Sequence, residues 1–474
     1  MLFAGGKLSI RFFKKEGIIF AAGVLCGFFI RTLMAKSDAP VNHQSQSSED
    51  DNSLENYILS MKKQIEDWGK QSDSGQNNQK ELAPECFMKV PEIIQYAGYP
   101  FELHTVTTSD GYNLGLHRIP HGKDEAEDKK LTQKPVVLLQ HGLLADSANW
   151  VSNGRSDSLA FLLADYGLDV WLGNVRGNTY SRSHVKLDPN VDEKFWRYSW
   201  QQFSEIDLPA MVDYIIEKTR NKKIYYIGHS QGTLIMFARL AEDPDFNEKI
   251  HLFIGLGPVF NLKGIKSPIK YLAQFYNTLE MGQWMMGGAE LLPNSEAGKW
   301  LGTKLHNFIE GNPDVKIHGE NMLLNIAGFS PRRYCRDRLP VYISHIPAGT
   351  SIQNIIHFAQ MIWHNETRKY RFDTEESNIE KYGSAVPPGY DLGAIKTPIA
   401  LYWGSDDWFA DSEDVLSILP RLKTLVKTKE LKDWDHLEFL YGSEAADTLY
   451  TELAEVIKDF EIKFQNYESR HVDL

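Results

Sequence analysis

The pentapeptide Gly228–Gly232, which reads Gly-His-Ser-Gln-Gly, constrains this chain more than any other feature. A run rich in β-branched and aromatic residues, 222–227, precedes it, and a helix-forming run, 233–240, follows it. A G-x-S-x-G sequence between a strand and a helix indicates a tight, strained turn that holds its serine at the end of a sheet. Side chains at either end of so tight a turn would clash, which explains Gly228 and Gly232. The sequence therefore predicts Ser230 as a nucleophile rather than part of a structural turn.

Strand-like and helix-like segments alternate on both sides of the pentapeptide. Residues 101–119, with Asp110-Gly111 in the middle, are typical of a β-hairpin. Continuous apolar runs of strand length are expected to be buried on both faces of a parallel sheet. Such a run covers 135–140, and 168–172 is another. Further strand-like segments lie at 222–227, 250–256, 398–403 and 424–428. The alternation predicts an α/β fold, a mostly parallel sheet flanked by helices.

Composition divides the chain of 474 residues into an N-terminal segment, a tether, a core and an insertion within the core. Residues 84–260 and 391–474 form the predicted α/β core, and 261–390 is a helical insertion rich in large apolar residues, typical of a cap or lid. Residues 37–83 form a polar tether. One stretch of the tether, 54–68, has helical apolar spacing, which favours a helix packed on the core over a membrane-surface helix.

Residues 1–36 contain an uncharged apolar run, 17–30, with basic residues on both sides. A bilayer span needs about 20 apolar residues, and this run reaches that length only by including residues beyond Arg31. Three interpretations remain open: a short retained anchor, a cleaved signal peptide, and a hairpin or monotopic anchor. No clear cleavage site follows the run. The sequence therefore favours a single retained anchor with a cytoplasmic N-terminus, in the endoplasmic reticulum or on lipid droplets.

The charge and the cysteine content exclude several classes of function. The formal net charge of −12 argues against nucleic acid as a partner. Three cysteines cannot build a disulfide framework. His357 and His364 are seven residues apart and no metal-binding motif surrounds them, so we predict neither a metal nor an organic cofactor.

A serine nucleophile needs a base, and the base needs an acid that orients it. When the acid follows the serine and the histidine comes last, the order is that of the α/β-hydrolase fold. Asp407 lies just past the strand at 398–403, and Asp406 and Asp411 remain alternatives. His436 follows the next strand. The sequence thus predicts Ser230, Asp407 and His436 as a catalytic triad.

The oxyanion of an acyl-transfer intermediate needs two backbone N–H donors. One donor is expected from Gln231, which follows the nucleophile. The other is expected from the loop after the strand at 135–140, which reads His141-Gly142-Leu143-Leu144. We expect Gly142 to let the backbone turn so that the Leu143 N–H points into the site, and we expect the His141 ring to brace the loop.

Many ordered motifs between about residues 90 and 465 resemble those of the acid lipase family, which includes gastric and lysosomal acid lipases and fungal steryl ester hydrolases. The resemblance implies an α/β-hydrolase fold with a helical cap at 261–390 that carries a lid segment. It also implies the same triad and the same oxyanion donors, Leu143 and Gln231. The motifs are Gly98-Tyr99-Pro100, 108–112, 141–144, Asn174-Val175-Arg176-Gly177-Asn178, 195–200, 207–210, 228–232 and 345–351.

This chain departs from the secreted members of that family. Those members carry a disulfide in the cap and several glycosylation sequons. Here the predicted cap contains only Cys335 and one sequon, at Asn365. Together with the N-terminal apolar run, this favours the membrane-anchored fungal branch.

The sequence therefore predicts a membrane-associated serine esterase that hydrolyses steryl esters to sterol and fatty acid. Its expected partners are a lipid ester substrate and a membrane or lipid-droplet surface. Triacylglycerol is the alternative substrate. Two hypotheses of another kind are a non-catalytic lipid-binding protein on a hydrolase scaffold, and a hydrolase of amides or short esters.

Overall fold

The computed structural model describes residues 83–125, 133–267, 269–270, 290–291, 333–335 and 338–471. The predicted anchor at 1–36 lies outside the described residues, as does all but the last residue of the predicted tether at 37–83. Much of the predicted cap at 261–390 lies outside them as well. Within the described ranges, no helix combines the length and the apolar character that crossing a membrane requires.

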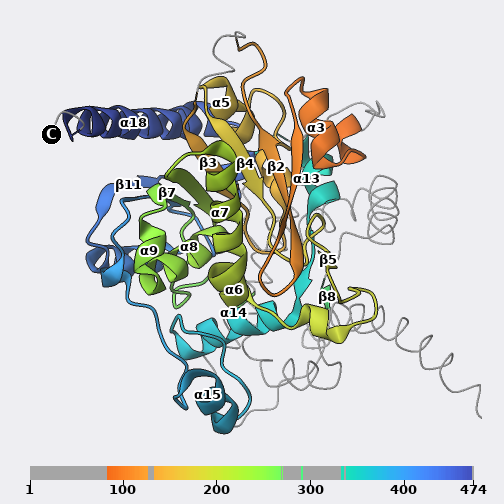
Figure 1. Ribbon diagram of the computed structural model, residues 1–474, viewed down its shortest axis with the longest axis vertical. Helices are drawn as coiled ribbons and strands as arrows, with labels where there is room; N and C mark the ends of the chain where they lie inside the picture. Colours follow the sequence, from red (N-terminus) through yellow and green to blue (C-terminus); the bar gives the residue numbers. More distant parts are fainter. Residues whose placement is uncertain are drawn as a thin grey trace, which may run out of the picture. The chain divides into compact units, whose positions relative to one another are not determined.

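A mostly parallel sheet forms the centre of the fold (Figure 1). Its order is β1-β2-β4-β3-β6-β7-β10-β11, with β5 paired to β2. The strands β4, β3, β6, β7, β10 and β11 run parallel, while β2 is antiparallel to β1, β4 and β5. The strands are β1 (Glu102–Thr107), β2 (Tyr112–Ile119), β3 (Val136–Gln140), β4 (Asp169–Gly173), β5 (Ser183–His184), β6 (Ile224–His229), β7 (Ile250–Leu256), β10 (Ile399–Gly404) and β11 (Leu425–Leu431).

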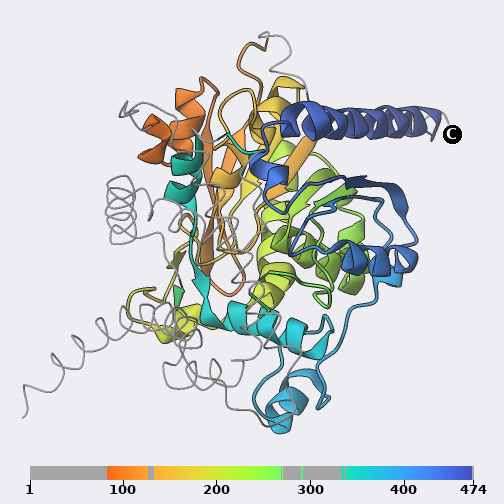
Figure 2. The ribbon, with the colours of Figure 1, turned by 180° about the vertical axis from the view of Figure 1, so that it is seen from behind.

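Side chains of successive strand residues point to opposite faces of this sheet, and helices cover both faces. In β3, Leu138 belongs to one apolar cluster, which also contains residues of α7 (Leu208–Thr219), α8 (Gln231–Glu242) and α16 (Ser412–Ile418). Its neighbours Val137 and Leu139 belong to the other, with residues of α5 (Leu159–Asp165) and α18 (Thr451–His471). Figures 1 and 2 show these two layers from opposite sides. The predicted α/β fold is therefore confirmed.

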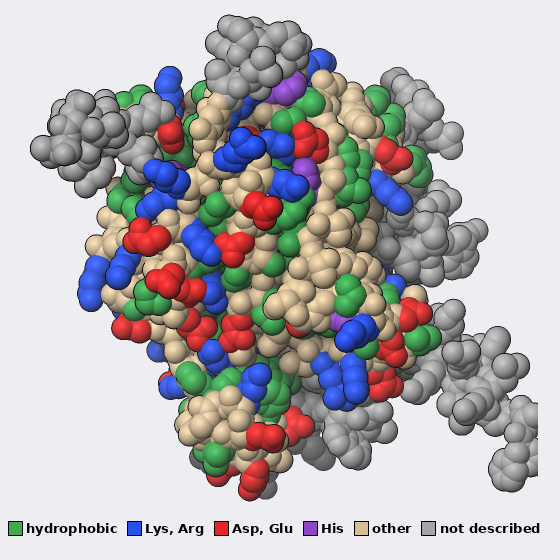
Figure 3. All heavy atoms as spheres, viewed as in Figure 1, with side chains coloured by type: hydrophobic (Ala, Val, Ile, Leu, Met, Phe, Trp, Pro, Cys, Tyr) green, Lys and Arg blue, Asp and Glu red, His purple; other side chains and the backbone are tan. Residues whose placement is uncertain are grey.

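Helix α14 (Ile352–His364) lies beside the sheet at the edge where β6 ends, with α15 (Glu375–Tyr382) beyond it (Figures 1 and 2). Both belong to the predicted cap region, as do α13 (Leu339–His345) and the short pair β8 (Glu290–Leu291) and β9 (Thr350–Ser351). Among the described residues, the other α-helices are α3 (Val90–Tyr96), α6 (Trp200–Gln202), α9 (Pro244–Asn247) and α17 (Glu438–Tyr441). On the face shown in Figure 3, acidic and basic side chains are interspersed.

A buried ion-pair network explains the motif at 174–178. Arg176 is almost fully buried, and its guanidinium group donates to both Asp207 and Asp110. The Arg176 N–H also donates to Asp207, and the guanidinium lies 4.0 Å from the centre of the Tyr112 ring. Because Asp207 ends a π-helical turn, Phe203–Asp207, the network fixes the junction between that turn and α7.

We expect Arg176→Met to destabilise the protein by about 3–5 kcal/mol, because it leaves the buried carboxylate of Asp207 without its cation. The free energy of unfolding in urea measures the loss. The double variant Arg176→Met with Asp207→Leu is the control, since removing both charges should restore part of the stability. A loss below about 1 kcal/mol in the single variant would contradict this role for the network.

Candidate active site

Ser230 lies in the turn between β6 and α8, with φ 55° and ψ −119°. A positive φ is uncommon and strained for residues other than glycine, so the surrounding structure must hold it. The Ser230 N–H donates to the Leu256 carbonyl (3.1 Å), and the Thr233 hydroxyl donates to the Ser230 carbonyl (2.6 Å). The turn therefore has the strained geometry that a nucleophile elbow requires.

At both glycines of the pentapeptide, backbone atoms lie close to the position that a Cβ atom would take. A Cβ atom on Gly228 would lie 2.7 Å from the Gly232 carbonyl. A Cβ atom on Gly232 would clash with the Gln140 carbonyl at the end of β3. Gly228 thus permits the turn to close, whereas Gly232 permits the turn to lie against the neighbouring strand.

His436 and Asp407 form a buried hydrogen-bonded pair. The Nδ1 atom of His436 lies 2.8 Å from Oδ2 of Asp407, and both side chains are almost fully buried. The other oxygen of Asp407 accepts the N–H groups of Phe409 and Ala410, each at 2.8 Å. These bonds fix the carboxylate so that one oxygen faces the imidazole, the orientation that an acid needs to hold the ring in one tautomer.

Ser230, Asp407 and His436 follow the carboxyl ends of β6, β10 and β11, and β7 lies between β6 and β10 in the sheet. The His229 and His436 rings are 4.7 Å apart, and His229 Nε2 lies 2.8 Å from the His436 carbonyl oxygen. This contact joins the turn that carries Ser230 to the loop that carries His436. No hydrogen bond joins the Ser230 hydroxyl to His436 among the described residues. Catalytic bonds of this kind are often completed only in the substrate complex.

The alternatives that chain order left open lie elsewhere. Asp406 is exposed. Asp411 accepts the Glu413 N–H at the start of α16 and pairs with Lys266. Among these residues, the structure brings only Asp407 and His436 together.

Gly257 is a residue that sequence reasoning missed. It follows β7 with φ 52°, and a Cβ atom on it would lie 3.1 Å from His436 Nδ1 and 3.2 Å from Asp407 Oδ2. Any side chain there would press on the hydrogen-bonded pair. A glycine directly after a buried strand that lies beside the nucleophile strand was the available signal.

The loop after β3 does not turn where we expected. The positive φ belongs to Leu144, at 58°, and not to Gly142. Gly142 provides space instead, since a Cβ atom on it would lie 3.0 Å from the Ser230 Cβ. Leu144 is held in place because its carbonyl accepts the Ala348 N–H at 2.7 Å. The loop that carries Leu143 therefore lies directly against the nucleophile turn.

His141 braces this loop. Its Nδ1 lies 2.8 Å from the Gly142 carbonyl, while its Nε2 faces the Val175 N–H at 3.3 Å and the Asn178 amide at 3.1 Å. Burial lowers the pKa of His141 to about 4, so the ring is neutral and Nε2 can accept both bonds. Part of the motif at 174–178 thus supports the oxyanion loop.

Gln231 begins α8, where the first N–H groups of a helix have no partner within the helix. Its side chain is fixed from α14: the Asn354 amide donates to the Gln231 side-chain oxygen at 2.8 Å. The Asn354 side-chain oxygen in turn accepts the Trp200 N–H at 2.7 Å. These bonds orient the Gln231 side chain, and neither of them uses the Gln231 backbone N–H.

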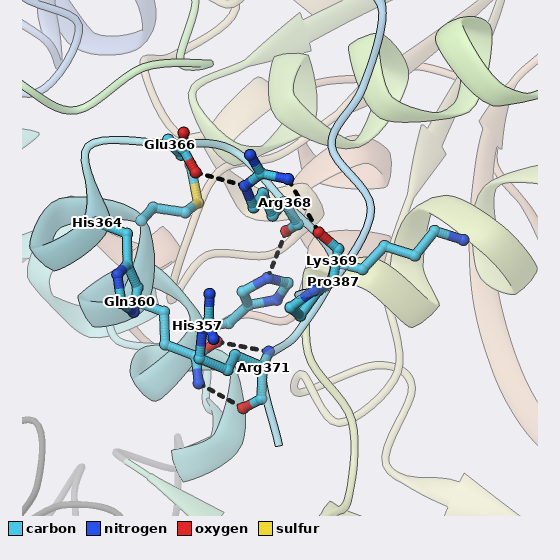
Figure 4. Close-up of a pocket in the computed structure, with 9 residues that line it drawn as sticks. His357, Gln360, His364, Glu366, Arg368, Lys369, Arg371 and Pro387 are labelled. Atoms are coloured by element: carbon cyan, nitrogen blue, oxygen red, sulfur yellow. Dashed lines mark hydrogen bonds and ion pairs between the residues drawn. The ribbon is translucent and has the colours of Figure 1, made fainter. Parts of the chain in front are cut away.

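His357 and His364 line a pocket beside α14, shown in Figure 4. His357 Nδ1 lies 2.9 Å from the Ser199 hydroxyl oxygen, and its Nε2 lies 2.9 Å from the Arg368 carbonyl oxygen. Burial lowers its pKa to about 3, and its ring stacks on Trp200. Both nitrogens are therefore occupied by structural bonds. Over the described part of the chain, no group of three or more His, Cys, Asp or Glu residues is arranged to hold a metal.

The sequon residue Asn365 is exposed at the end of α14, with φ 51°. Its partner Thr367 is buried, and the Thr367 hydroxyl donates to the Phe260 carbonyl. The asparagine is thus accessible in the folded protein, while the threonine is not.

Two family models match the chain. One, described as a partial alpha/beta-hydrolase lipase region, covers residues 90–154, and the other, described as the alpha/beta hydrolase fold, covers 135–293. Lipase lipl-1 of Caenorhabditis elegans is 42% identical, over 79% of this chain and 93% of its own length. The human lysosomal acid lipase/cholesteryl ester hydrolase is 38% identical, over 83% of this chain and 96% of its own length. Human lipase member K is 38% identical, over 80% of this chain and 92% of its own length.

The fold and these matches together define a carboxylic ester hydrolase, a lipase or esterase of the α/β-hydrolase class. More specifically, the chain belongs to the acid lipase family. The predicted family and the predicted enzyme class are therefore confirmed, and a non-catalytic lipid-binding role is not supported. These three relatives are animal proteins, so membership of the fungal branch stays a prediction.

The predicted localisation requires correction. We expected a single N-terminal anchor in the endoplasmic reticulum or on lipid droplets. No described helix could cross a membrane, and a relative that matches most of the chain is named as a lysosomal enzyme. The physical reason lies in the run at 17–30, which is outside the described residues: it is shorter than the roughly 20 residues of a span and is followed by Arg31.

Proposed function

We propose that this chain hydrolyses steryl esters through an acyl-enzyme on Ser230. The observation that carries the mechanism is the buried His436–Asp407 pair beside a strained serine turn. His436 takes the proton of the Ser230 hydroxyl as the oxygen attacks the ester carbonyl. Asp407 holds the proton on Nδ1, so that Nε2 is free to accept.

The backbone N–H groups of Leu143 and Gln231 would hold the oxyanion of the tetrahedral intermediate, each contributing roughly 3 kcal/mol. Support comes from the contact of Gly142 with Ser230, which brings the Leu143 loop to the nucleophile. His436 then gives its proton to the departing sterol oxygen. Water attacks the acyl-enzyme by the same route and releases the fatty acid.

The choice of steryl ester rests on the human relative that is named lysosomal acid lipase/cholesteryl ester hydrolase. The test compares purified protein on emulsified cholesteryl oleate, emulsified trioleoylglycerol and a soluble short-chain ester, with Ser230→Ala protein as the blank. We expect the largest kcat/KM for cholesteryl oleate among the three. A larger value for trioleoylglycerol would overturn this choice in favour of a triacylglycerol lipase, and a larger value for the short ester would indicate a small-ester hydrolase.

A further inference from the structure

The segment 333–335 packs against the loop that carries His436. Tyr334 pairs with Gly442 in an antiparallel β-bridge. The Arg333 carbonyl accepts two bonds from Ser443, one from its N–H at 2.8 Å and one from its hydroxyl at 2.9 Å. A piece of chain about a hundred residues away in the sequence is thus attached to the residues that follow α17, the helix that comes directly after the His436 loop.

Two acidic residues, Asp435 and Glu438, lie on either side of His436 in the sequence of this loop. Asp435 Oδ1 accepts the N–H groups of Leu437 (2.9 Å) and Glu438 (3.1 Å), and Glu438 Oε2 accepts the Asp435 N–H at 2.6 Å. This reciprocal pair of bonds resembles a capping box and fixes the backbone from 435 to 438. Because His436 lies inside that span, the box sets the direction in which its side chain leaves the backbone.

Tyr334 hydrogen-bonds to one acid of the box, and Arg333 forms an ion pair with the other. The Tyr334 hydroxyl donates to Asp435 Oδ1, and Arg333 Nε lies 3.6 Å from Glu438 Oε1. Asp435 is fully buried, and a buried carboxylate needs donors. Burial raises the pKa of Tyr334 well above its usual value, and the Asp435 charge raises it further, so the hydroxyl keeps its proton and donates.

We propose that Tyr334 is a positioning residue for His436, acting through Asp435. The inference rests on the proposed triad, in which His436 is the base. Without the hydroxyl, Asp435 Oδ1 keeps the two backbone N–H bonds but loses a donor that comes from outside the loop. His436 then samples orientations from which it does not reach Ser230, while the binding surface for the substrate is unchanged.

The test is Tyr334→Phe, measured per active site after titration with a fluorophosphonate. We expect kcat on the best substrate and the limiting rate of fluorophosphonate inactivation each to fall about tenfold, because small misplacements of a catalytic group are costly. KM and the inhibitor binding constant should stay within about twofold. Loss of folded protein alone would not produce this split, since only titrated sites are counted.

Tyr342→Phe is the matched control. Tyr342 is also buried, and its ring stacks on Tyr441 of α17. Its hydroxyl also donates to a side chain, but to that of Asn153 rather than to an acid of the His436 loop. We expect wild-type kcat for this variant. An equal loss of kcat in both variants, or a change in Tyr334→Phe that is confined to KM, would overturn the inference.

A double-mutant cycle with Asp435→Asn tests the route. If Tyr334 acts through Asp435, Tyr334→Phe should lower the kcat of the Asp435→Asn enzyme by less than twofold. If the two residues act independently, the decreases in kcat of the two single variants would multiply in the double variant. Asp435→Asn alone should show the same split between kcat and KM, which keeps the test usable if Tyr334→Phe folds poorly. Wild-type protein that the fluorophosphonate does not label at Ser230 would count against the proposed function itself. Labelled wild-type protein with an unaffected Tyr334→Phe variant would count against this inference alone.

Discussion

Ser230→Ala is expected to lower kcat for ester hydrolysis by about 10⁵- to 10⁶-fold, because it removes the atom that forms the acyl-enzyme. The substitution is sterically mild, since alanine retains the Cβ atom and Ser230 makes its holding bonds through the backbone. We therefore expect the same unfolding temperature and substrate binding as in the wild type. The measurement is hydrolysis of the preferred ester, with labelling by a fluorophosphonate as a second readout.

Ser417→Ala is the control for this variant. Ser417 lies on α16, where its hydroxyl donates to the Asp414 carbonyl. It should keep wild-type activity and labelling. Ester hydrolysis by Ser230→Ala at more than about one hundredth of the wild-type rate would show that another group is the nucleophile, because triad nucleophiles contribute far more than that.

Asp407→Asn has the second largest expected effect, a fall in kcat of about 10⁴-fold. The Asp407 oxygen that accepts the Phe409 and Ala410 N–H groups must stay an oxygen, so the new amide nitrogen would face His436 Nδ1. An amide donates at that position. The imidazole would then carry its proton on Nε2 and could not accept the proton of Ser230.

Asp406→Asn is the matched control for Asp407→Asn, since it makes the same chemical change at the adjacent, exposed residue. We expect its kcat to stay within about threefold of the wild type, as surface charges act weakly through solvent. If Asp406→Asn proved as slow as Asp407→Asn, the assignment of the acid would be wrong.

Local patterns were sufficient to predict the sheet. Buried parallel strands are continuous apolar runs, and the runs at 135–140 and 250–256 coincide with β3 and β7 to within a residue. The elbow could also be located, because the glycines of the pentapeptide are required by the backbone itself. Chain order brought Asp407 and His436 into consideration, but left Asp406 and Asp411 as competitors of Asp407.

Other features depend on contacts between distant segments, which single-sequence patterns do not reveal. Leu144 rather than Gly142 takes the positive φ, because Ala348, which follows α13, holds the Leu144 carbonyl from about two hundred residues further along the chain. Gly257 is required by a histidine that lies far along the chain. Tyr334 had no pattern of its own, since its hydroxyl partner is about a hundred residues away.

The proposed reacting groups follow the ends of β6, β10 and β11, whose spacing is fixed at about 4.8 Å per neighbouring strand by the hydrogen bonds of the sheet. The proposed bond-breaking chemistry is therefore tied to the sheet, whereas α14 and α15 lie outside it. The insertion between β7 and β10 is nevertheless not independent of that chemistry, since Tyr334 and Ala348 within it bond to the loops that carry His436 and Leu143. A chimera that receives a relative's insertion would replace both contacts, and it should therefore change the rate of acylation as well.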